Sequence, residues 1–251
     1  MLACPTSGGE LFIVLINNRQ LCCELLELLP AFRLIFYRQR NTNYLHKMAA
    51  IPPGGTWFDT LKTSFADVPI DVANDKGIAT TEFLEAAEAL TSLFDILGSA
   101  AFSPVKSDLN GNIKKVRDRQ LAAPGESETL QALVLNELKT KKHVATEGLV
   151  WLVRGLDFTA QALRHNIDHP NNELSDSFRD AYGKTLKAHH SFIIKPIFSA
   201  AMSATPYRAN FYAKLGSDPE KVQAAIQREV KALEDRVAIL KSFQDRKEAK
   251  W

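Results

Sequence analysis

The chain has 251 residues, of which 45% are apolar and 24% charged, a composition that fits one globular domain with a substantial core. Its 31 basic and 29 acidic side chains nearly cancel, which argues against the long-range electric field of a nucleic-acid-binding protein. The three cysteines, Cys4, Cys22 and Cys23, all precede Met48. A disulfide framework is therefore excluded for the rest of the chain, and a reducing, cytoplasmic environment is expected.

Residues 1–47 are interpreted as an N-terminal extension. The apolar run LFIVLI at 11–16 is much shorter than the ~20 residues that a membrane span needs, and no small-residue cleavage site follows it. The extension is expected to be disordered, or to be an upstream addition to the reading frame with Met48 as the functional start. An amphipathic anchor or targeting arm is the alternative. Residues 48–251 form the predicted domain.

Residues 80–98 are expected to form the first long helix, because apolar side chains recur on one helical face and Gly98 follows as a stop signal. These apolar side chains are Phe83, Ala87, Leu90, Phe94 and Leu97. Ser103 and Pro104 have the residue types preferred at a helix N-cap and at the first helical position, so the next helix is predicted to begin there. The Pro-Gly pair at 124–125 is expected to end it.

The later segments also have helical periodicity, and two-residue alternation is nearly absent. Residues 143–167 form one such segment, and residues 175–204 form the longest, in which Pro196 is predicted to kink the helix. Ser217 or Asp218 is expected to cap a final helix. The sequence therefore predicts an all-α fold.

The most polar chemistry lies in FSPVKSDLNGNIKKVRDRQL, residues 102–121, where the run DLNGN has three interpretations. A calcium loop that starts at Asp108 would need glycine at its sixth position and an acid at its twelfth, which here are Ile113 and Arg119. A hairpin turn at the Asn-Gly pair would need alternating strands on both sides, whereas both flanks have helical patterns. A helix is the interpretation that remains.

On such a helix, Asp108, Asn112 and Lys115 follow one another along the border of an apolar stripe, and Arg119 continues the same spacing. A carboxylate accepts hydrogen bonds, an ammonium donates them and an amide does both, so these three side chains are suited to a polyhydroxylated group. An ordinary solvated face with an Asp–Lys pair is the alternative. Spacing alone leaves both interpretations open.

Trp151 and three histidines are further candidates. Trp151 lies in a predicted helix where Gly148 and Gly155 would let another element approach closely, and its indole is either part of the core or a stacking surface for a sugar ring. His190 lies among apolar residues and is either a core histidine or the single polar group of an apolar pocket. His165 and His169 have the i, i+4 spacing of metal ligands, but no third ligand is near them in sequence, so no metal site is expected.

Taken together, DLNGNIKK, WLVRGLDF and HHSFIIKPIFSAAMSATPY resemble the glycolipid transfer protein family, in particular its fungal, heterokaryon-incompatibility-protein-like members. The resemblance runs from about Thr56 to near the C-terminus and covers none of residues 1–47. It implies a two-layer, all-helical sandwich. It further implies a cytoplasmic, monomeric lipid carrier that binds glycosphingolipids, contacts membranes transiently and needs no cofactor, no catalytic residue and no nucleic acid.

The resemblance also implies roles for particular residues. Asp108, Asn112 and Lys115 would bond the first sugar, Trp151 would stack under it, and His190 would bond the ceramide amide region. A hydrophobic tunnel for the lipid chains would be lined by Phe94, Leu97, Phe102, Val105, Leu186 and Phe198. An amide and an indole stand where members that resemble ceramide-1-phosphate carriers have basic residues, which favours a glycolipid over a phospholipid.

Membrane contact is expected at Phe192, where vertebrate members have a tryptophan. Ser203 stands where those members have a tyrosine, so membrane docking and transfer rate are expected to differ. A glycolipid sensor or cell-death regulator that acts through a protein partner is the alternative function. A hydrolase using Asp108 and His190 would lack a nucleophile motif, and a purely structural helical scaffold would carry no lipid.

Overall fold

The protein is described by a computed structural model over residues 50–250; the predicted extension, residues 1–47, and Met48 lie outside the described residues. Within this range the only strands are β1 (Ile70–Asp71) and β2 (Gly77–Ile78), which pair antiparallel with Ile70 opposite Ile78. All other regular elements here are helical. The prediction of an all-α fold is therefore confirmed, with one short hairpin added.

The helix expected over residues 80–98 is interrupted. It consists of α3 (Thr80–Leu90) and α4 (Leu93–Ile96). At the break, the hydroxyls of Thr91 and Ser92 each donate a hydrogen bond of 2.7 Å to the carbonyl three residues earlier. Such local bonds compete with helix continuation, so the helix breaks here although the apolar periodicity continues.

The next helix, α5 (Ser99–Ala122), begins before the predicted Ser103-Pro104 start, and Pro104 lies inside it. Gly98 has a φ of 118°, a conformation that favours glycine, and it makes the turn between α4 and α5. The prediction that Gly98 ends the preceding helix holds, whereas the predicted start of α5 was wrong: the first helical residue is Ser99 and not Pro104, a difference of five residues. A tight glycine turn took the place of a Ser-Pro start.

The remaining helices are α6 (Leu130–Glu137), α7 (Val144–Asp168), α8 (Leu174–Lys184), α9 (Ile194–Ser203), α10 (Arg208–Leu215) and α11 (Pro219–Gln244). Short 3₁₀ turns lie at Trp57–Thr60, Phe65–Asp67, Pro124–Glu126, Leu186–Ala188 and Lys247–Ala249. Asp218 caps α11 as expected, since its side chain accepts hydrogen bonds from the backbone N–H groups of Glu220 and Lys221 in the first turn.

The long segment expected over residues 175–204 is not one kinked helix. It ends as α8 at Lys184, continues through a 3₁₀ turn and resumes as α9 only at Ile194. Pro196 lies in the first turn of α9, where its missing N–H has no helical acceptor to lose. His190 therefore lies on a connection between helices and not on a helical face.

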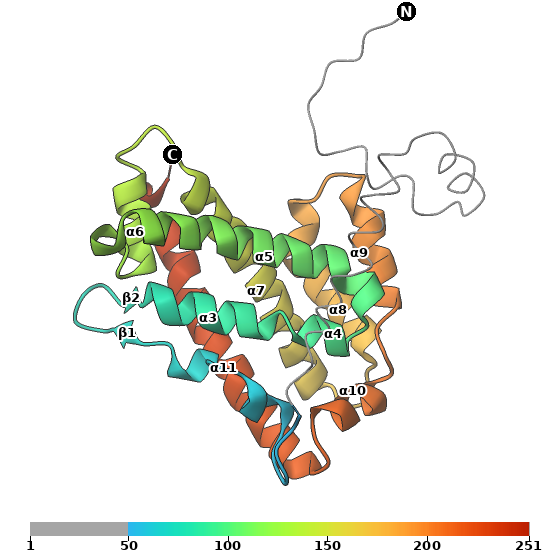
Figure 1. Cartoon of the computed structure of the whole chain (residues 1–251). Coiled ribbons are helices and arrows are strands. Elements are labelled where there is room, and N and C mark those ends of the chain that lie inside the picture. Colours follow the sequence, from blue (N-terminus) through green and yellow to red (C-terminus); the bar gives the residue numbers. More distant parts are fainter. Residues whose placement is uncertain (1–49, 251) are drawn as a thin grey trace, which may run out of the picture. The chain divides into compact units, whose positions relative to one another are not determined.

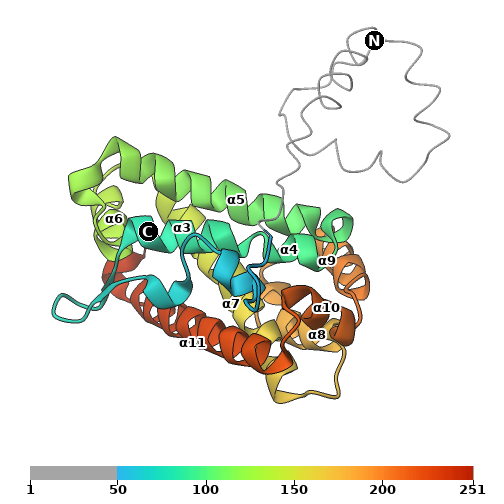
Figure 2. The ribbon, with the colours of Figure 1, turned by 60° about the horizontal axis from the view of Figure 1, so that its bottom comes forward.

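The helices form two layers. In Figure 1, α3 and α5 run side by side across the front of the molecule, with α7 and α11 passing behind them. Figure 2, turned by 60°, shows α5 and α11 along opposite edges, while α7 contacts both of them. Side chains from both layers form one continuous apolar core.

The start of α7 is fixed by a buried carboxylate of α6. Glu137 accepts hydrogen bonds from the backbone N–H of Ala145 at 3.0 Å and of Thr146 at 2.6 Å, and the Thr146 hydroxyl donates to it as well. A negative group at a helix N-terminus satisfies backbone donors that have no helical partner. This contact therefore fixes where α7 begins.

Candidate functional site

Three side chains on consecutive turns of α5 form the feature called here the polar edge: Asp108, Asn112 and Lys115. The Asn112 amide nitrogen donates to Asp108 Oδ2 at 3.3 Å, and Lys115 Nζ donates to Asn112 Oδ1 at 3.1 Å. Asn112 is buried, whereas Asp108 and Lys115 are exposed. The amide is therefore oriented by a charged neighbour on each side.

The polar edge is electrostatically unusual at Asp108. Although the residue reaches solvent, the protein around its carboxylate removes enough water that desolvation raises the pKa of Asp108 above its ordinary value. Lys115 and the Asn112 amide act in the opposite direction by favouring the charged form. A partly desolvated carboxylate gains more than a fully hydrated one from a hydroxyl donor that arrives with a ligand.

Two glycines of α7 let α5 approach closely beside this edge. A Cβ on Gly148 would lie 3.0 Å from Lys115 Cβ and 3.4 Å from the Asn112 carbonyl oxygen, and one on Gly155 would lie 2.7 Å from Leu109 Cδ2. The close approach expected from the two glycines is confirmed. Trp151 lies between these two glycines on α7, the helix that packs against α5.

Trp151 is half-buried and has aromatic and cationic neighbours. His190 stacks on its indole with ring centroids 6.2 Å apart and planes at 20°, and His189 meets it edge-on at 6.4 Å. The Arg154 guanidinium carbon lies 4.8 Å from the indole centroid, which is a cation–π distance. Arg154 and His189 were not among the predicted site residues.

His190 is held in place on the α8–α9 connection by aromatic side chains. Its Nδ1 lies 3.2 Å from the Tyr182 hydroxyl, and its ring is 4.5 Å from that of Phe198. Burial lowers the pKa of His190, and the nearby His189 and Lys195 lower it further. The ring is therefore neutral at pH 7. Tyr182 had no sequence signal, because the helix ends between it and His190 and their spacing does not indicate contact.

The six predicted tunnel residues are all buried in the core. Three of them belong to a series of touching rings that runs inward from His190: Phe198, Phe158, Phe178, Phe102 and Phe94, with successive centroids 4.5, 6.1, 5.5, 5.8 and 5.7 Å apart. The other three, Leu97, Val105 and Leu186, belong to the same apolar cluster. Their role as a tunnel wall remains a prediction.

Phe192, the predicted membrane-contact residue, is 82% exposed, and the adjacent Ile193 is 61% exposed. Lys187 and Lys195 flank them, are exposed, and make no ion pair with any residue from 50 to 250. No described helix combines the length and the apolar character that crossing a bilayer requires. An apolar pair beside free cations is the pattern of a surface that rests on a membrane.

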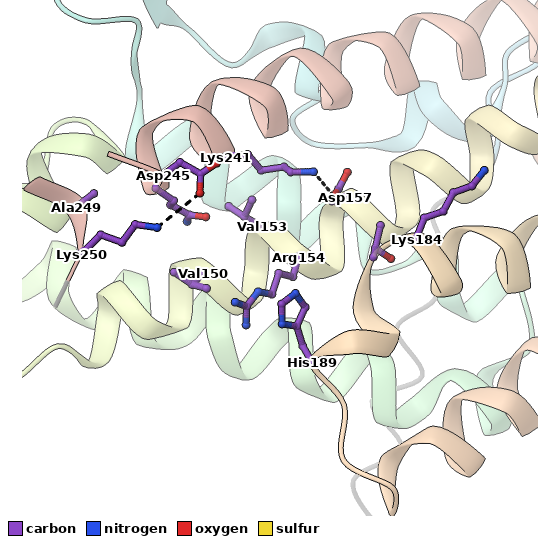
Figure 3. Close-up of a pocket in the computed structure, with 12 residues that line it drawn as sticks. Val150, Val153, Arg154, Asp157, Lys184, His189, Lys241, Asp245, Ala249 and Lys250 are labelled. Atoms are coloured by element: carbon purple, nitrogen blue, oxygen red, sulfur yellow. Dashed lines mark hydrogen bonds and ion pairs between the residues drawn. The ribbon is translucent and has the colours of Figure 1, made fainter. Parts of the chain in front are cut away.

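Arg154 also lines a pocket of about 490 Å³, which lies between α7, the end of α8 and the end of α11. Figure 3 shows the Arg154 guanidinium beside the His189 ring, away from the Lys241–Asp157 pair. That pair is 2.6 Å apart, and Lys250 lies 3.7 Å from Asp245, so most charges of the pocket neutralise one another. None of the predicted tunnel residues lines this pocket.

The described residues contain no cluster of three or more side chains suited to a metal ion. His165 and His169 instead stack on each other at 4.2 Å, and His165 Nδ1 lies 3.1 Å from the Ser177 hydroxyl. Arg119, which continues the spacing of the polar edge, pairs with Glu126 at 2.6 Å and takes no part in it.

Comparison with known proteins assigns the fold. Residues 78–217, more than half of the chain, match the glycolipid transfer protein (GLTP) family. A glycolipid transfer protein of Aureobasidium melanogenum is 67% identical over 204 residues, which cover 81% of this chain and all of that protein. The crystal structure of HET-C2, a fungal glycolipid transfer protein, superposes with a TM-score of 0.76 at 61% identity, over 77% of this chain and 98% of that one.

The GLTP-fold structure of FAPP2, described as selecting simple glycosphingolipids, superposes with a TM-score of 0.68 at 33% identity, over 76% of this chain and 95% of that one. Agreement of the family match, the sequence identity and the superposition confirms both the resemblance expected from the motifs and the two-layer helical architecture. The chain belongs to the glycolipid transfer protein family.

Proposed function

We propose that the protein is a carrier that takes a glycosphingolipid from one membrane and delivers it to another. The observation that supports this most directly is the polar edge of α5, which packs against the helix that carries Trp151. A buried amide held between a carboxylate and an ammonium can exchange hydrogen bonds with sugar hydroxyls, and a half-exposed indole offers the apolar face that sugar C–H groups need.

The ceramide chains would occupy the core between the two layers, beside Phe94, Leu97, Phe102, Val105, Leu186 and Phe198. Each methylene removed from water contributes ~0.8 kcal/mol, so a lipid with two long chains will not cross water unaided. The polar edge selects the headgroup, and the apolar interior replaces the bilayer. No bond is made or broken, and residues 48–251 carry the whole activity.

We place the membrane contact at Phe192 and Ile193, with Lys187 and Lys195 facing the lipid headgroups. The protein would dock as a monomer from the cytoplasm, with no nucleic acid involved. Phenylalanine has no polar atom for the wet interface, unlike tryptophan. The two lysines compensate for this by attraction to negative lipids.

The test is transfer of fluorescent galactosylceramide between vesicles by the wild type and by Trp151→Ala. Loss of the stacking face should slow transfer by roughly 30-fold, equivalent to about 2 kcal/mol, while the circular dichroism spectrum stays helical. Trp151→Phe, which keeps an aromatic face, should retain most of the activity. Unchanged transfer by Trp151→Ala would refute the site.

Mass spectrometry of the lipid after incubation covers the rival functions. Recovery of intact galactosylceramide in the acceptor vesicles supports a carrier. Cleaved lipid would reveal an enzyme, and lipid that binds without ever reaching acceptor vesicles would indicate a sensor.

A further inference from the structure

The surroundings of His190 suggest a role for Tyr182. Tyr182 is buried, with 5% of its surface exposed, and its ring stacks on Phe198 at 5.3 Å and 14°. Phe198 in turn contacts the imidazole at 4.5 Å, and Trp151 stacks on the imidazole from α7. The packing of Phe198 and Trp151 thus holds the Tyr182 hydroxyl 3.2 Å from Nδ1 of His190.

The direction of this hydrogen bond follows from burial. If Nδ1 carried the proton, the Tyr182 oxygen would accept and its own O–H would need another acceptor. Among residues 50–250 the Tyr182 hydroxyl has no partner besides Nδ1. A buried donor without an acceptor is costly, so the hydroxyl donates and Nδ1 is unprotonated. The single proton of the neutral imidazole then lies on Nε2.

We infer that Tyr182 is a positioning residue that holds His190 in the Nε2–H tautomer, so that the imidazole offers the ligand a hydrogen-bond donor and no acceptor. Nε2 has no hydrogen-bond partner in the described part of the chain, which leaves it free for a ligand. This inference rests on the proposed function for the identity of that ligand. The group that meets Nε2 must be an acceptor, which in a ceramide is the amide carbonyl oxygen and not the amide N–H.

The charged and titratable groups around His190 keep the ring neutral. On its own segment lies His189, from α9 comes Lys195, and from α8 comes Tyr182; no acid is among the groups that shift the His190 pKa. Burial lowers that pKa most, and the neighbouring His189 and Lys195 lower it further. A donated O–H bond to Nδ1 acts in the same direction because it requires the lone pair.

The experiment is ¹⁵N NMR of the imidazole in the unliganded full-length protein, for the wild type and Tyr182→Phe. The wild type should show a protonated Nε2 and an unprotonated Nδ1. Tyr182→Phe should lose this preference, and the midpoint of the His190 titration should rise by ~0.4–1 unit, because a net hydrogen bond to the neutral form is lost. Galactosylceramide transfer should fall by roughly 2–10-fold in the same variant.

Tyr212→Phe is the matched control. Its hydroxyl lies 3.2 Å from Asn166 Oδ1, the same distance as in the Tyr182–His190 pair, but away from His190. It should leave the His190 tautomer, titration and transfer unchanged. In a His190→Ala background, Tyr182→Phe should cause no further loss of transfer, because a positioning residue acts only through the residue it positions.

A wild-type protein with its proton on Nδ1 would overturn the inference without any variant. So would a Tyr182→Phe protein with an unchanged tautomer and titration midpoint, or additive losses in the double variant. The NMR measurements contain no lipid, so their outcome is independent of the carrier function. A correct tautomer in a protein that transfers no glycolipid would sink the carrier function and leave the positioning role intact.

Discussion

The two parts of the candidate site are built in opposite ways. The α5–α7 contact carries the polar edge and Trp151 on two long helices that glycines bring together, and its key amide is buried. The α8–α9 connection carries His190 and Phe192 on a non-helical segment whose tip is largely exposed. A headgroup reader needs fixed donors and acceptors, whereas a surface that meets a membrane needs exposed apolar groups.

This contrast teaches that each site residue has a different kind of support. Asn112 is fixed by neighbours on its own helix, at 3.3 and 3.1 Å. His190 is fixed by side chains from other elements, Tyr182, Phe198 and Trp151. Changes to the first region should therefore affect stability and recognition together, while changes to the second should separate membrane binding from folding.

Glycine substitutions should reveal the largest difference. Gly148→Val places new atoms against Lys115 Cβ, 3.0 Å from the new Cβ, and should lower the free energy of unfolding by about 1–3 kcal/mol through overpacking. Gly183→Ala in α8 meets nothing within 4 Å and should raise it by about 0.5–1 kcal/mol, because alanine favours a helix. Urea unfolding measures both. Equal effects would contradict the close α5–α7 contact at Gly148.

Charge removal beside Phe192 should have the next largest effect. Lys187→Gln combined with Lys195→Gln should weaken binding to phosphatidylserine vesicles by about 1 kcal/mol per lysine, or roughly fivefold each, and leave the free energy of unfolding unchanged. Co-sedimentation with vesicles measures this at low and high salt.

Lys141→Gln with Lys142→Gln is the control for this pair. Both lysines are exposed on the α6–α7 loop, and Figure 1 shows α6 and α9 at opposite ends of the described domain. This variant should bind the vesicles like the wild type. If both double variants lost the same affinity, net charge would be responsible and the Phe192 surface would not.

The pH dependence of folding should be the smallest effect. The pKa of His190 in the folded protein lies below the ordinary 6.5, so the unfolded chain binds a proton first as pH falls. Well above pH 6.5 the imidazole is neutral in both states, and His190 does not change the free energy of unfolding. As pH drops from 6.5 toward the lower folded-state pKa, proton binding to the unfolded chain reduces that free energy. Urea unfolding at pH 7.5 and 5.5 should differ less in His190→Gln than in the wild type; an identical difference would contradict the assignment to His190.

Sequence reasoning predicted which side chains of α5 share an edge, because helical spacing alone determines this. Asp108, Asn112 and Lys115 lie within one continuous helix, and no distant contact was needed to bring them together. The two glycines of α7 likewise indicated a close approach from the sequence alone. The sequence did not indicate which helix would approach them.

The second region was predicted less well. Apolar periodicity continues through residues 185–193 although the helix does not, since a 3₁₀ turn and a helix place similar side chains inward. Where α8 ends, the Thr185 hydroxyl donates a hydrogen bond of 2.7 Å to the Ala181 carbonyl. Where α3 ends, the Thr91 hydroxyl likewise donates one of 2.7 Å to the Glu88 carbonyl. Hydroxyl residues at these positions were the available signal. The contact of Tyr182 with His190 depends on tertiary packing and had none.

The rings that run inward from His190 bear on how a cargo would leave. Neighbouring aromatic pairs such as Phe158 and Phe178, 5.5 Å apart, touch each other and leave no room for a hydrocarbon chain between them. A lipid chain that occupied this path would have to separate them, and its departure would let them meet again. We expect the ring contacts that re-form behind a departing chain to offset part of the contact energy that the chain gives up.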